Sequence, residues 1–410
     1  MRLLRTARFA AACAVTCAAA LGLTALAGCA APDAALRHPA TTPAAGVSGA
    51  SYAVPLTSAP TAGPSAAPRR TRPFSMVGAV WNDARAPLDA TVRIRTRRSA
   101  DGRWGPWTVL QAEDRVDPDP GRKQARGYTS PLWVGPSDGV QVAVGRPVGG
   151  VLPAGLHLAL VDPGGPGDPA RQPPVAGGPP GWLLLPTAAA PHPRRTFTAP
   201  RPAIVTRAGW RADESLRHRT SLVYAGAVHM VFIHHTDNPN GYSCSQVPDM
   251  IRAMYQYHVA ELAWDDIGYN FLVDRCGTIY EGRAGGVDRP VVGGHTMGFN
   301  IGSMGIAAIG DFRAGHPVPK PMADSIARLA AWKLSLAGVD PAGRATMVSQ
   351  DSATRYAKGT AVRLAAISGH RDAVWTECPG DSLYAALPGI RAAAARIVAA
   401  ARARALAHPH

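Results

Sequence analysis

Short apolar and β-branched runs alternate with turn-forming stretches in the first half of the chain. Such runs occupy residues 74–81, 90–96, 107–110, 139–144 and 156–161. Turn-rich sequences such as Asp101-Gly102 separate them. Short strands bounded by Gly, Pro, Asp and Ser are typical of antiparallel β-structure. We therefore expect residues 73–162 to form a small all-β, sandwich-like domain.

Helical and strand periods alternate after residue 200. Strands are predicted at 228–235, 269–274, 278–281 and 304–309, and helices at 246–261, 323–336 and 383–405, the last interrupted by Pro388. This alternation is typical of an α/β domain in which helices pack on a central sheet. Residues 201–400 are thus predicted to form an α/β domain with a central mixed β-sheet flanked by helices.

Two segments contain too few large apolar residues to bury a core. Residues 30–72 are rich in Ala, Pro, Ser and Thr, which predicts a disordered tether. Residues 163–200 are dominated by Gly and Pro, which predicts a semi-extended linker between two domains. After the apolar stretch at 9–26 the chain has no run of eighteen apolar residues, so no further membrane-spanning segment is predicted.

The N-terminal end has the pattern of an export signal. Arginines at positions 2, 5 and 8 precede an apolar stretch at 9–26, so residues 1–28 are predicted to be a signal peptide. The sequence Leu26-Ala27-Gly28-Cys29 resembles a bacterial lipobox, which implies lipidation of Cys29. We expect the protein at the extracellular face of the cell membrane through this lipid anchor, or secreted to the cell wall if cleavage occurs nearby without lipidation.

The chain is basic, with 43 Lys plus Arg against 28 Asp plus Glu and a formal net charge of +15. For an exported protein this charge favours an anionic cell wall as neighbour. A coding bias toward Arg, Ala, Gly and Pro would give the same excess without a functional cause. No basic stripe with interleaved aromatic residues occurs in the sequence, so we expect no nucleic-acid partner.

The cysteine count suggests a metal. Of six cysteines, Cys13 and Cys17 lie in the signal peptide and Cys29 is the predicted lipid anchor. Three remain in the folded part, at positions 244, 276 and 378. An odd number in an oxidising compartment predicts one disulfide pair and one thiolate held by a metal.

Three residues have the chemistry of a zinc site. His234 ends an apolar strand, and His370 and Cys378 lie eight residues apart in a Gly- and Pro-containing loop. Two imidazoles and one thiolate leave the fourth zinc position open for water, as in catalytic sites. Individually, a strand-end histidine and a lone cysteine are more often structural. Strand alternation also places His234 and His235 on opposite faces without deciding which one faces the site.

Five segments occur in a characteristic order: Val231–Thr236, Trp264–Val273, Ile279–Arg283, Gly294–Asn300 and Gly369–Gly380. Together they resemble the peptidoglycan recognition protein (PGRP) family, which is similar to the type-2 N-acetylmuramoyl-L-alanine amidases and to phage T7 lysozyme. The resemblance runs from about Arg201 to Ile390, nearly half of the chain. It implies the PGRP fold for the α/β domain, and peptidoglycan, both stem peptide and glycan, as partner.

The resemblance also assigns roles. It implies Zn²⁺ as cofactor, with His234, His370 and Cys378 as its ligands, and Tyr269 and Thr376 as catalytic residues. The implied reaction is hydrolysis of the amide between N-acetylmuramic acid and L-alanine. A non-catalytic peptidoglycan-binding receptor is the alternative, although such members commonly lack the cysteine ligand.

Residues outside the ligand set have weaker assignments. His295, Asn300 and Arg283 resemble substrate-groove residues, with a buried histidine and a surface arginine as the structural alternatives. Many members that prefer diaminopimelate-type stems have Gly-Trp after this arginine, whereas Ala284-Gly285-Gly286 follow here, so stem preference is not carried over. Asp372 is expected to support the His370 loop or to cap a turn.

With Cys378 assigned to the metal, Cys244 and Cys276 remain, and export predicts a disulfide between them. Animal members instead carry a close-spaced pair after the histidine strand, which this chain lacks. Four tryptophans of the β-domain could form a glycan-stacking face, but packing in the sandwich is favoured: Trp81, Trp104, Trp107 and Trp133. We expect a monomer.

Overall fold

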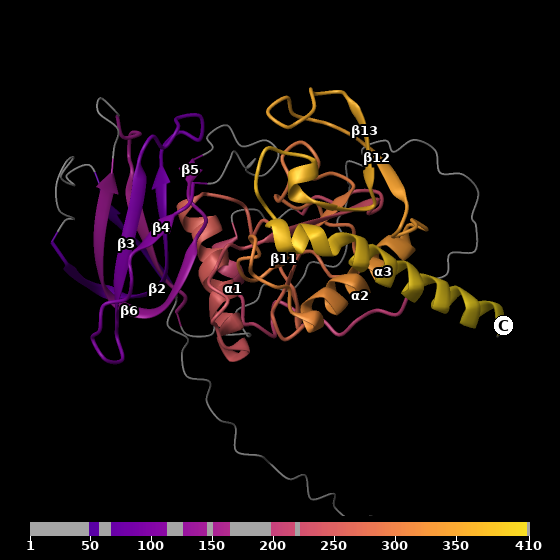
Figure 1. Cartoon of the computed structure of the whole chain (residues 1–410), viewed down its shortest axis with the longest axis horizontal. Helices are drawn as coiled ribbons and strands as arrows, with labels where there is room; N and C mark the ends of the chain where they lie inside the picture. The colour runs from indigo at the N-terminus through magenta and orange to yellow at the C-terminus, as the bar shows by residue number, and fades with distance from the viewer. Residues whose placement is uncertain are drawn as a thin grey trace, which may run out of the picture. The chain divides into compact units, whose positions relative to one another are not determined.

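The computed structural model describes residues 49–56, 67–112, 126–145, 151–164, 198–217 and 222–407 (Figure 1). The predicted signal peptide, Cys29, most of the predicted tether and residues 165–197 of the predicted linker lie outside the described residues. Those assignments therefore stay predictions.

Seven strands form the N-terminal β-domain: β1 (Ala50–Pro55), β2 (Arg69–Trp81), β3 (Thr91–Arg98), β4 (Thr108–Leu110), β5 (Gly127–Tyr128), β6 (Leu132–Gly145) and β7 (His157–Asp162). Hydrogen bonds join them in the order β1-β7-β2-β6-β3-β4, and β5 pairs with β2. All pairs described in this sheet are antiparallel. The region preceding the α/β domain is thus all-β, as predicted.

The tether prediction is wrong for two stretches. Residues 50–55 form β1, which pairs along its length with β7, and β2 already begins at Arg69. Only alternate residues of this edge strand face the core, and Tyr52 and Val54 are the β1 side chains that pack against it. A composition rule that expects a core-forming segment to be rich in apolar residues misses such a strand.

Strands β2 and β7 are buried on both faces. Side chains alternate across a strand, so one set faces the core of the β-domain and the other faces away from it. The first set is Val77, Ala79, Leu158 and Leu160, and the second is Met76, Val80, Ala159 and Val161. The second set packs in one cluster with a helix of the α/β domain, so the two domains share a hydrophobic core.

The four tryptophans of the β-domain do not form one surface. Trp81 and Trp133 are buried, with exposed fractions of 4% and 7%. Trp104 and Trp107 lie 5.4 and 5.2 Å from the Arg95 guanidinium, and Trp107 is 37% exposed. Packing accounts for the first pair, and cation–π contact accounts for the second.

The α/β domain has a five-stranded mixed sheet in the order β10-β9-β11-β8-β14, which confirms the predicted fold class. The strands are β8 (Met230–His235), β9 (Phe271–Val273), β10 (Ile279–Glu281), β11 (Ser303–Ala308) and β14 (Ile367–Gly369). Strands β14, β8, β11 and β9 run parallel, and β10 is antiparallel to β9. A separate hairpin pairs β12 (Arg344–Val348) with β13 (Ala361–Ala365).

Helices cover both faces of this sheet. On one face, α2 (Lys320–Leu336) and α3 (Asp381–Ala407) pack over Val231, Ile233 and Ile306. On the other, α1 (Val247–Gln256) packs over Leu272 and Ala307. The chain continues from α1 into η4 (Tyr257–Glu261), a single π-helical turn. The remaining short helices are η2 (Glu214–Leu216), η3 (Cys244–Gln246) and η5 (His370–Asp372).

The interruption predicted at Pro388 does not occur. Helix α3 runs through Pro388, because Leu387 and Ile390 on either side of it are buried in the core. Within the described ranges, α3 alone has the length and composition to cross a membrane, with a mean hydropathy of 1.3. Its four buried residues, Leu383, Leu387, Ile390 and Ala394, pack in one cluster with those of α2.

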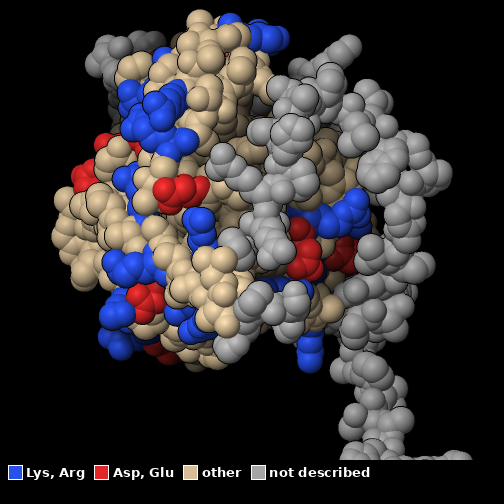
Figure 2. All heavy atoms as spheres, turned by 90° about the vertical axis from the view of Figure 1, so that its right-hand side faces the viewer, with Lys and Arg blue, Asp and Glu red and all other residues tan. Residues whose placement is uncertain are grey.

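Charged side chains on the face shown in Figure 2 lie in several separate groups. Lys and Arg side chains outnumber Asp and Glu there, and acidic residues lie between them. This face does not present one continuous basic stripe of the kind that tracks a nucleic-acid backbone.

Candidate metal centre and pocket

Parallel strand pairing brings the predicted metal ligands together. His234 lies at the carboxyl end of β8, and His370 directly follows β14, whose Gly369 pairs with Ile233 of β8. Carboxyl ends of neighbouring parallel strands share one sheet edge, the usual place for a site in such folds. The loop after η5 then adds Cys378.

The three donors form a compact group. The His234 and His370 ring centroids are 4.3 Å apart, and Cys378 Sγ lies 3.8 Å from His234 Nδ1. One donor atom from each of the three residues lies within 4.8 Å of the others, and all three side chains are buried. These residues could hold a metal ion with two nitrogens and one sulfur, a donor set suited to zinc.

The structure also decides between the two adjacent histidines. His235 turns to the other side of the strand, where its Nδ1 accepts a hydrogen bond from the Phe312 backbone N–H at 3.3 Å. Its own backbone N–H donates to Cys378 Sγ at 3.4 Å. His235 therefore directs its backbone N–H to Cys378 and its Nδ1 to the Phe312 backbone, and it is not one of the three grouped donors.

Burial keeps the imidazoles in the form that binds metals. Desolvation, followed by the neighbouring His235, lowers the pKa of His370 to about 3. Desolvation, with His370 as the next cause, holds the pKa of His234 well below its usual value. Both rings are thus neutral near pH 7, and each keeps a nitrogen lone pair for a metal.

Hydrogen bonds hold the loop that carries two of the ligands. Asp372 Oδ2 accepts from the Gly369 backbone N–H at 2.9 Å, and Tyr384 donates its hydroxyl to Asp372 Oδ1 at 2.6 Å. Thr376 Oγ1 accepts from the Cys378 backbone N–H at 3.1 Å. Asp372 and Thr376 therefore position the His370 and Cys378 backbone.

A second hydrogen-bonded chain leads away from His234. Its Nε2 lies 3.4 Å from Thr296 Oγ1, which lies 2.9 Å from His295 Nδ1. If His234 presents Nδ1 to the metal, we assign the ring proton of His234 to Nε2. Thr296 Oγ1 then accepts a hydrogen bond from His234 Nε2–H, and the Thr296 hydroxyl donates one to His295 Nδ1. That places the His295 proton on Nε2. This atom is buried and has no hydrogen-bond partner within the described part of the chain.

Asn300 has a structural position. Its Oδ1 accepts from the backbone N–H groups of His295 and Thr296, at 2.8 and 2.9 Å. The side chain is buried, with an exposed fraction of 4%. Asn300 thus shapes the turn that presents His295 and Thr296, and its oxygen is occupied in doing so.

A pocket surrounds the three donors. The α/β-domain residues that line it include His234, His235, Thr236, Met254, His258, Trp264, Tyr269, Gly294, His295, His370 and Cys378. The Tyr269 ring centroid lies 5.3 Å from that of His234. Of the residues predicted from sequence, Thr376, Arg283 and Asn300 do not line the pocket. Desolvation is the main cause that lowers the pKa values of His258 and His295, and the charge of the nearby Arg283 adds to it.

His258 is a pocket residue that the sequence analysis missed. It lies on the π-turn η4, and its ring centroid is 4.5 Å from that of Trp264. Its Nδ1 accepts from the Gly268 backbone N–H at 3.3 Å. A histidine inside a helical pattern carries no chemical signal, and only the π-turn, a feature frequent at functional sites, turns it toward the pocket.

A buried ion-pair network supports the loop that ends at Tyr269. Arg207 pairs with Glu214 at 2.6 Å and Asp266 at 3.1 Å, and its side chain is 6% exposed. Asp266 also accepts from the backbone N–H groups of Ile267 and Ala284, at 2.7 and 2.9 Å. Two carboxylates thus compensate one buried guanidinium and hold two loops together.

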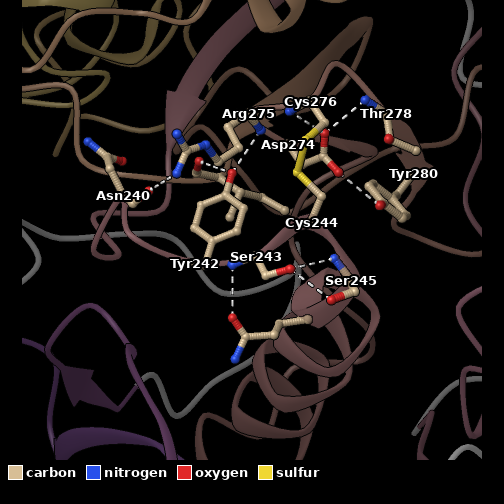
Figure 3. Close-up of a disulfide and its surroundings, with 12 residues drawn as sticks. Asn240, Tyr242, Ser243, Cys244, Ser245, Asp274, Arg275, Cys276, Thr278 and Tyr280 are labelled. Atoms are coloured by element: carbon tan, nitrogen blue, oxygen red, sulfur yellow. Dashed lines mark hydrogen bonds between the residues drawn. A yellow bond between two sulfur atoms is a disulfide. The ribbon is translucent and has the colours of Figure 1, made fainter.

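Cys244 and Cys276 form a disulfide (Figure 3). It joins the beginning of η3, just before α1, to the turn after β9. Asp274 steadies the same turn by accepting from the backbone N–H groups of Cys276 and Thr278, at 2.9 and 2.8 Å. The bridge therefore fixes the N-terminal end of the helix that covers the pocket side of the sheet.

Two family matches divide the chain. Residues 224–381 match the N-acetylmuramoyl-L-alanine amidase family, and residues 33–177 match the family described as Rv3811 N-terminal galactose-binding domain-like. The chain thus belongs, through its α/β domain, to the family of peptidoglycan recognition proteins and N-acetylmuramoyl-L-alanine amidases.

Individual relatives carry both names. Peptidoglycan-recognition protein LB of Drosophila melanogaster is 32% identical over 187 residues, which cover 44% of this chain and 66% of that protein. The N-acetylmuramoyl-L-alanine amidase of Homo sapiens is 31% identical over 185 residues, 45% of this chain and 27% of that protein. The solved structure of wild-type Drosophila PGRP-LB is 31% identical, covers 45% of this chain and 91% of that chain, and has a TM-score of 0.34. The family contains enzymes and recognition proteins, so membership alone does not assign catalysis.

Proposed function

We propose that this protein is a zinc-dependent amidase that hydrolyses the bond between N-acetylmuramic acid and L-alanine in peptidoglycan. The observation that carries the proposal is the buried group of His234, His370 and Cys378, with Tyr269 lining the same pocket. Two neutral imidazoles and a thiolate that accepts a backbone N–H fit zinc. When bound, zinc would supply an activated water and polarise the scissile carbonyl.

The chain's own residues have distinct roles in this proposal. Tyr269 would donate a hydrogen bond to the oxygen on which negative charge develops, which is where a preorganised donor contributes most. His295 would offer its Nε2–H to a substrate carbonyl, since that buried donor has no partner among the described residues. Thr376 would act through Cys378, whose backbone N–H it accepts.

A peptidoglycan-binding receptor without catalysis is the alternative function. Both alternatives share the ligand class: a solved structure of a Drosophila PGRP-LB mutant, 31% identical to this chain, is a complex with tracheal cytotoxin. The thiolate donor Cys378 favours the enzyme, because a receptor needs no metal ligand to hold a peptide.

The test uses the chain from residue 30 onward, with both domains, incubated with purified sacculi. An amidase releases new L-alanine amino termini without new reducing sugar ends. Tyr269→Phe should lower the rate by about 10²-fold or more while zinc content stays near one per chain. Tyr224→Phe is the matched control, since it removes a hydroxyl hydrogen bond, to Gly285 O, outside the pocket lining.

Each failure has its own signature in this experiment. Cys378→Ala should lose zinc, and full zinc retention would remove Cys378 from the ligand set. Binding to sacculi with neither kind of new end would indicate the receptor. New reducing ends would indicate glycan cleavage and refute the amidase.

We also propose that a lipid on Cys29 anchors the protein to the outer face of the membrane. Cys29 lies outside the described residues. Cys29→Ala should move the protein from the membrane fraction to the medium. Mass spectrometry of the N-terminal peptide detects the lipid directly, and an unmodified Cys29 in membrane-bound protein would contradict the anchor.

A further inference from the structure

The β-domain is built into the catalytic domain and does not behave as a separate module. Met76 and Val161, on the outward faces of β2 and β7, lie in one apolar cluster with Met250 and Met254 of α1. Removing such apolar side chains from water stabilises the contact. The outward faces of β2 and β7 therefore share one apolar cluster with α1.

Polar contacts converge on the turn that carries His258 into the pocket. Glu261, at the end of η4, accepts a hydrogen bond from Ser51 Oγ and lies 3.4 Å from His157 Nε2. Arg126 donates to the Glu261 carbonyl at 2.5 Å. Tyr257 donates its hydroxyl to the Thr129 carbonyl at 3.1 Å. Three separate segments of the β-domain thus bind this one turn.

The segment Tyr128–Pro131, between β5 and β6, is held in place from several sides. Thr129 exchanges hydrogen bonds with the Ala79 backbone, both at 2.9 Å, and the Ser130 backbone N–H donates to Gln111 O at 3.0 Å. Such fixed backbone can present side chains to a ligand without an ordering cost on binding.

A further hydrogen bond joins the start of β6 to the loop that follows His234. The Trp133 backbone N–H donates to Asn238 Oδ1 at 2.5 Å, and Asn238 Nδ2 donates to Thr236 O at 3.0 Å. Asn238 is fully buried. The β-domain and the metal-bearing strand are thus connected through one side chain.

Three residues of this segment line the pocket around the metal donors: Tyr128, Ser130 and Pro131. The Tyr128 ring packs edge-to-face on Trp264, with 5.9 Å between centroids. The wall therefore consists of an aromatic pair, a hydroxyl and a pyrrolidine, with no charged side chain.

We propose that Tyr128–Pro131 is a substrate-binding wall that contacts the muramyl sugar beside the scissile amide, so that the β-domain determines specificity inside the catalytic pocket. This rests on the proposed amidase function. A pyranose presents apolar C–H faces and neutral hydroxyl and acetamido groups, which suit such a wall. The stem peptide carries carboxylates, which a wall without a charged side chain does not match.

The test compares two soluble substrates in the two-domain protein: a muramyl peptide and the same peptide acylated by lactate without the sugar. Ser130→Val removes the hydroxyl and adds volume at the wall. We expect kcat/KM for the muramyl peptide to fall about tenfold or more, mainly through KM, and to change less than about twofold for the lactoyl peptide. Ser99→Val is the matched control at an exposed turn of the same domain.

Equal losses on both substrates, or no loss on either, would overturn the proposal. The zinc content and the unfolding midpoint of Ser130→Val are measured in parallel. If either differs from the wild type, Ser130→Gly is used in place of Ser130→Val. If the wild type cleaves neither substrate, the amidase function fails while the wall is still tested by calorimetry. Muramyl-peptide binding about tenfold weaker in Ser130→Val, with lactoyl-peptide binding unchanged, then supports the wall, and any other pattern refutes it.

Discussion

The burial of His258 predicts a measurable loss of stability in acid. Desolvation, followed by the charge of Arg283, lowers the pKa of His258 in the folded protein to about 3, against about 6.5 in an unfolded chain. A base whose pKa is lowered by folding is charged more easily in the unfolded chain. The stability that the neutral, buried His258 permits is complete above about pH 6.5 and is lost as the pH falls toward 3.

The magnitude follows from these two values. Between pH 7.5 and pH 5 the unfolded chain takes up a proton at His258 and the folded protein does not, which lowers the free energy of unfolding by about 2 kcal/mol. His258→Asn removes this titration and keeps an oxygen near the position of Nδ1, where it can accept from the Gly268 backbone N–H. Other titrating groups contribute equally to both proteins and cancel in the difference.

Urea unfolding at the two pH values, at a fixed zinc concentration, provides the measurement. The stability lost between pH 7.5 and pH 5 should be about 2 kcal/mol smaller in His258→Asn than in the wild type. His229→Asn, at an exposed position of the same domain, is the control for replacing a histidine by asparagine. An identical pH dependence in His258→Asn and wild type would refute a buried, neutral His258.

Three further outcomes follow from the contacts. Arg207→Met leaves the buried Asp266 carboxylate without its cation, while Glu214 keeps Arg217, and should lower the free energy of unfolding by about 3–5 kcal/mol in denaturant titrations; a loss below about 1 kcal/mol would contradict the buried network. Replacing Cys244 and Cys276 by Ser opens a bridge with a sequence separation of 32 and should cost about 3–4 kcal/mol, and an unchanged thermal midpoint would contradict it. Thr376→Val removes the acceptor for the Cys378 N–H and should weaken zinc about tenfold in competition with a chelator, whereas unchanged affinity with lost activity would give Thr376 a direct catalytic role.

Much of the fold followed from local pattern. The predicted strand at 74–81 lies within β2, and the helix predicted at 323–336 lies within α2, because a period of two or of 3.6 residues is a property of the local sequence. The missed strand β1 and the uninterrupted α3 were decided by partners far away in the chain. An edge strand is stabilised by the strand it pairs with, and Pro388 is tolerated because the surrounding turns are buried.

The candidate site divides in the same way. The sequence by itself determined the chemistry, namely two histidines and a thiolate with zinc-ligand character, and an odd cysteine count that called for a metal. Strand alternation did not decide between His234 and His235, because it defines two faces without naming the one that meets His370 after β14, and only the resemblance to the family selected His234. The resemblance also suggested a substrate contact for Asn300, whose oxygen the structure commits to two backbone N–H groups.

Only the tertiary structure placed the β-domain at the pocket. The unbroken apolar run of β2 is the mark of a strand covered on both faces, but it does not say what covers the second face. Periodicity is a property of neighbouring residues along the chain. The packing of α1 on the second face of β2, and the place of Tyr128–Pro131 at the pocket, depend instead on contacts between residues more than one hundred positions apart, such as Tyr257 with Thr129.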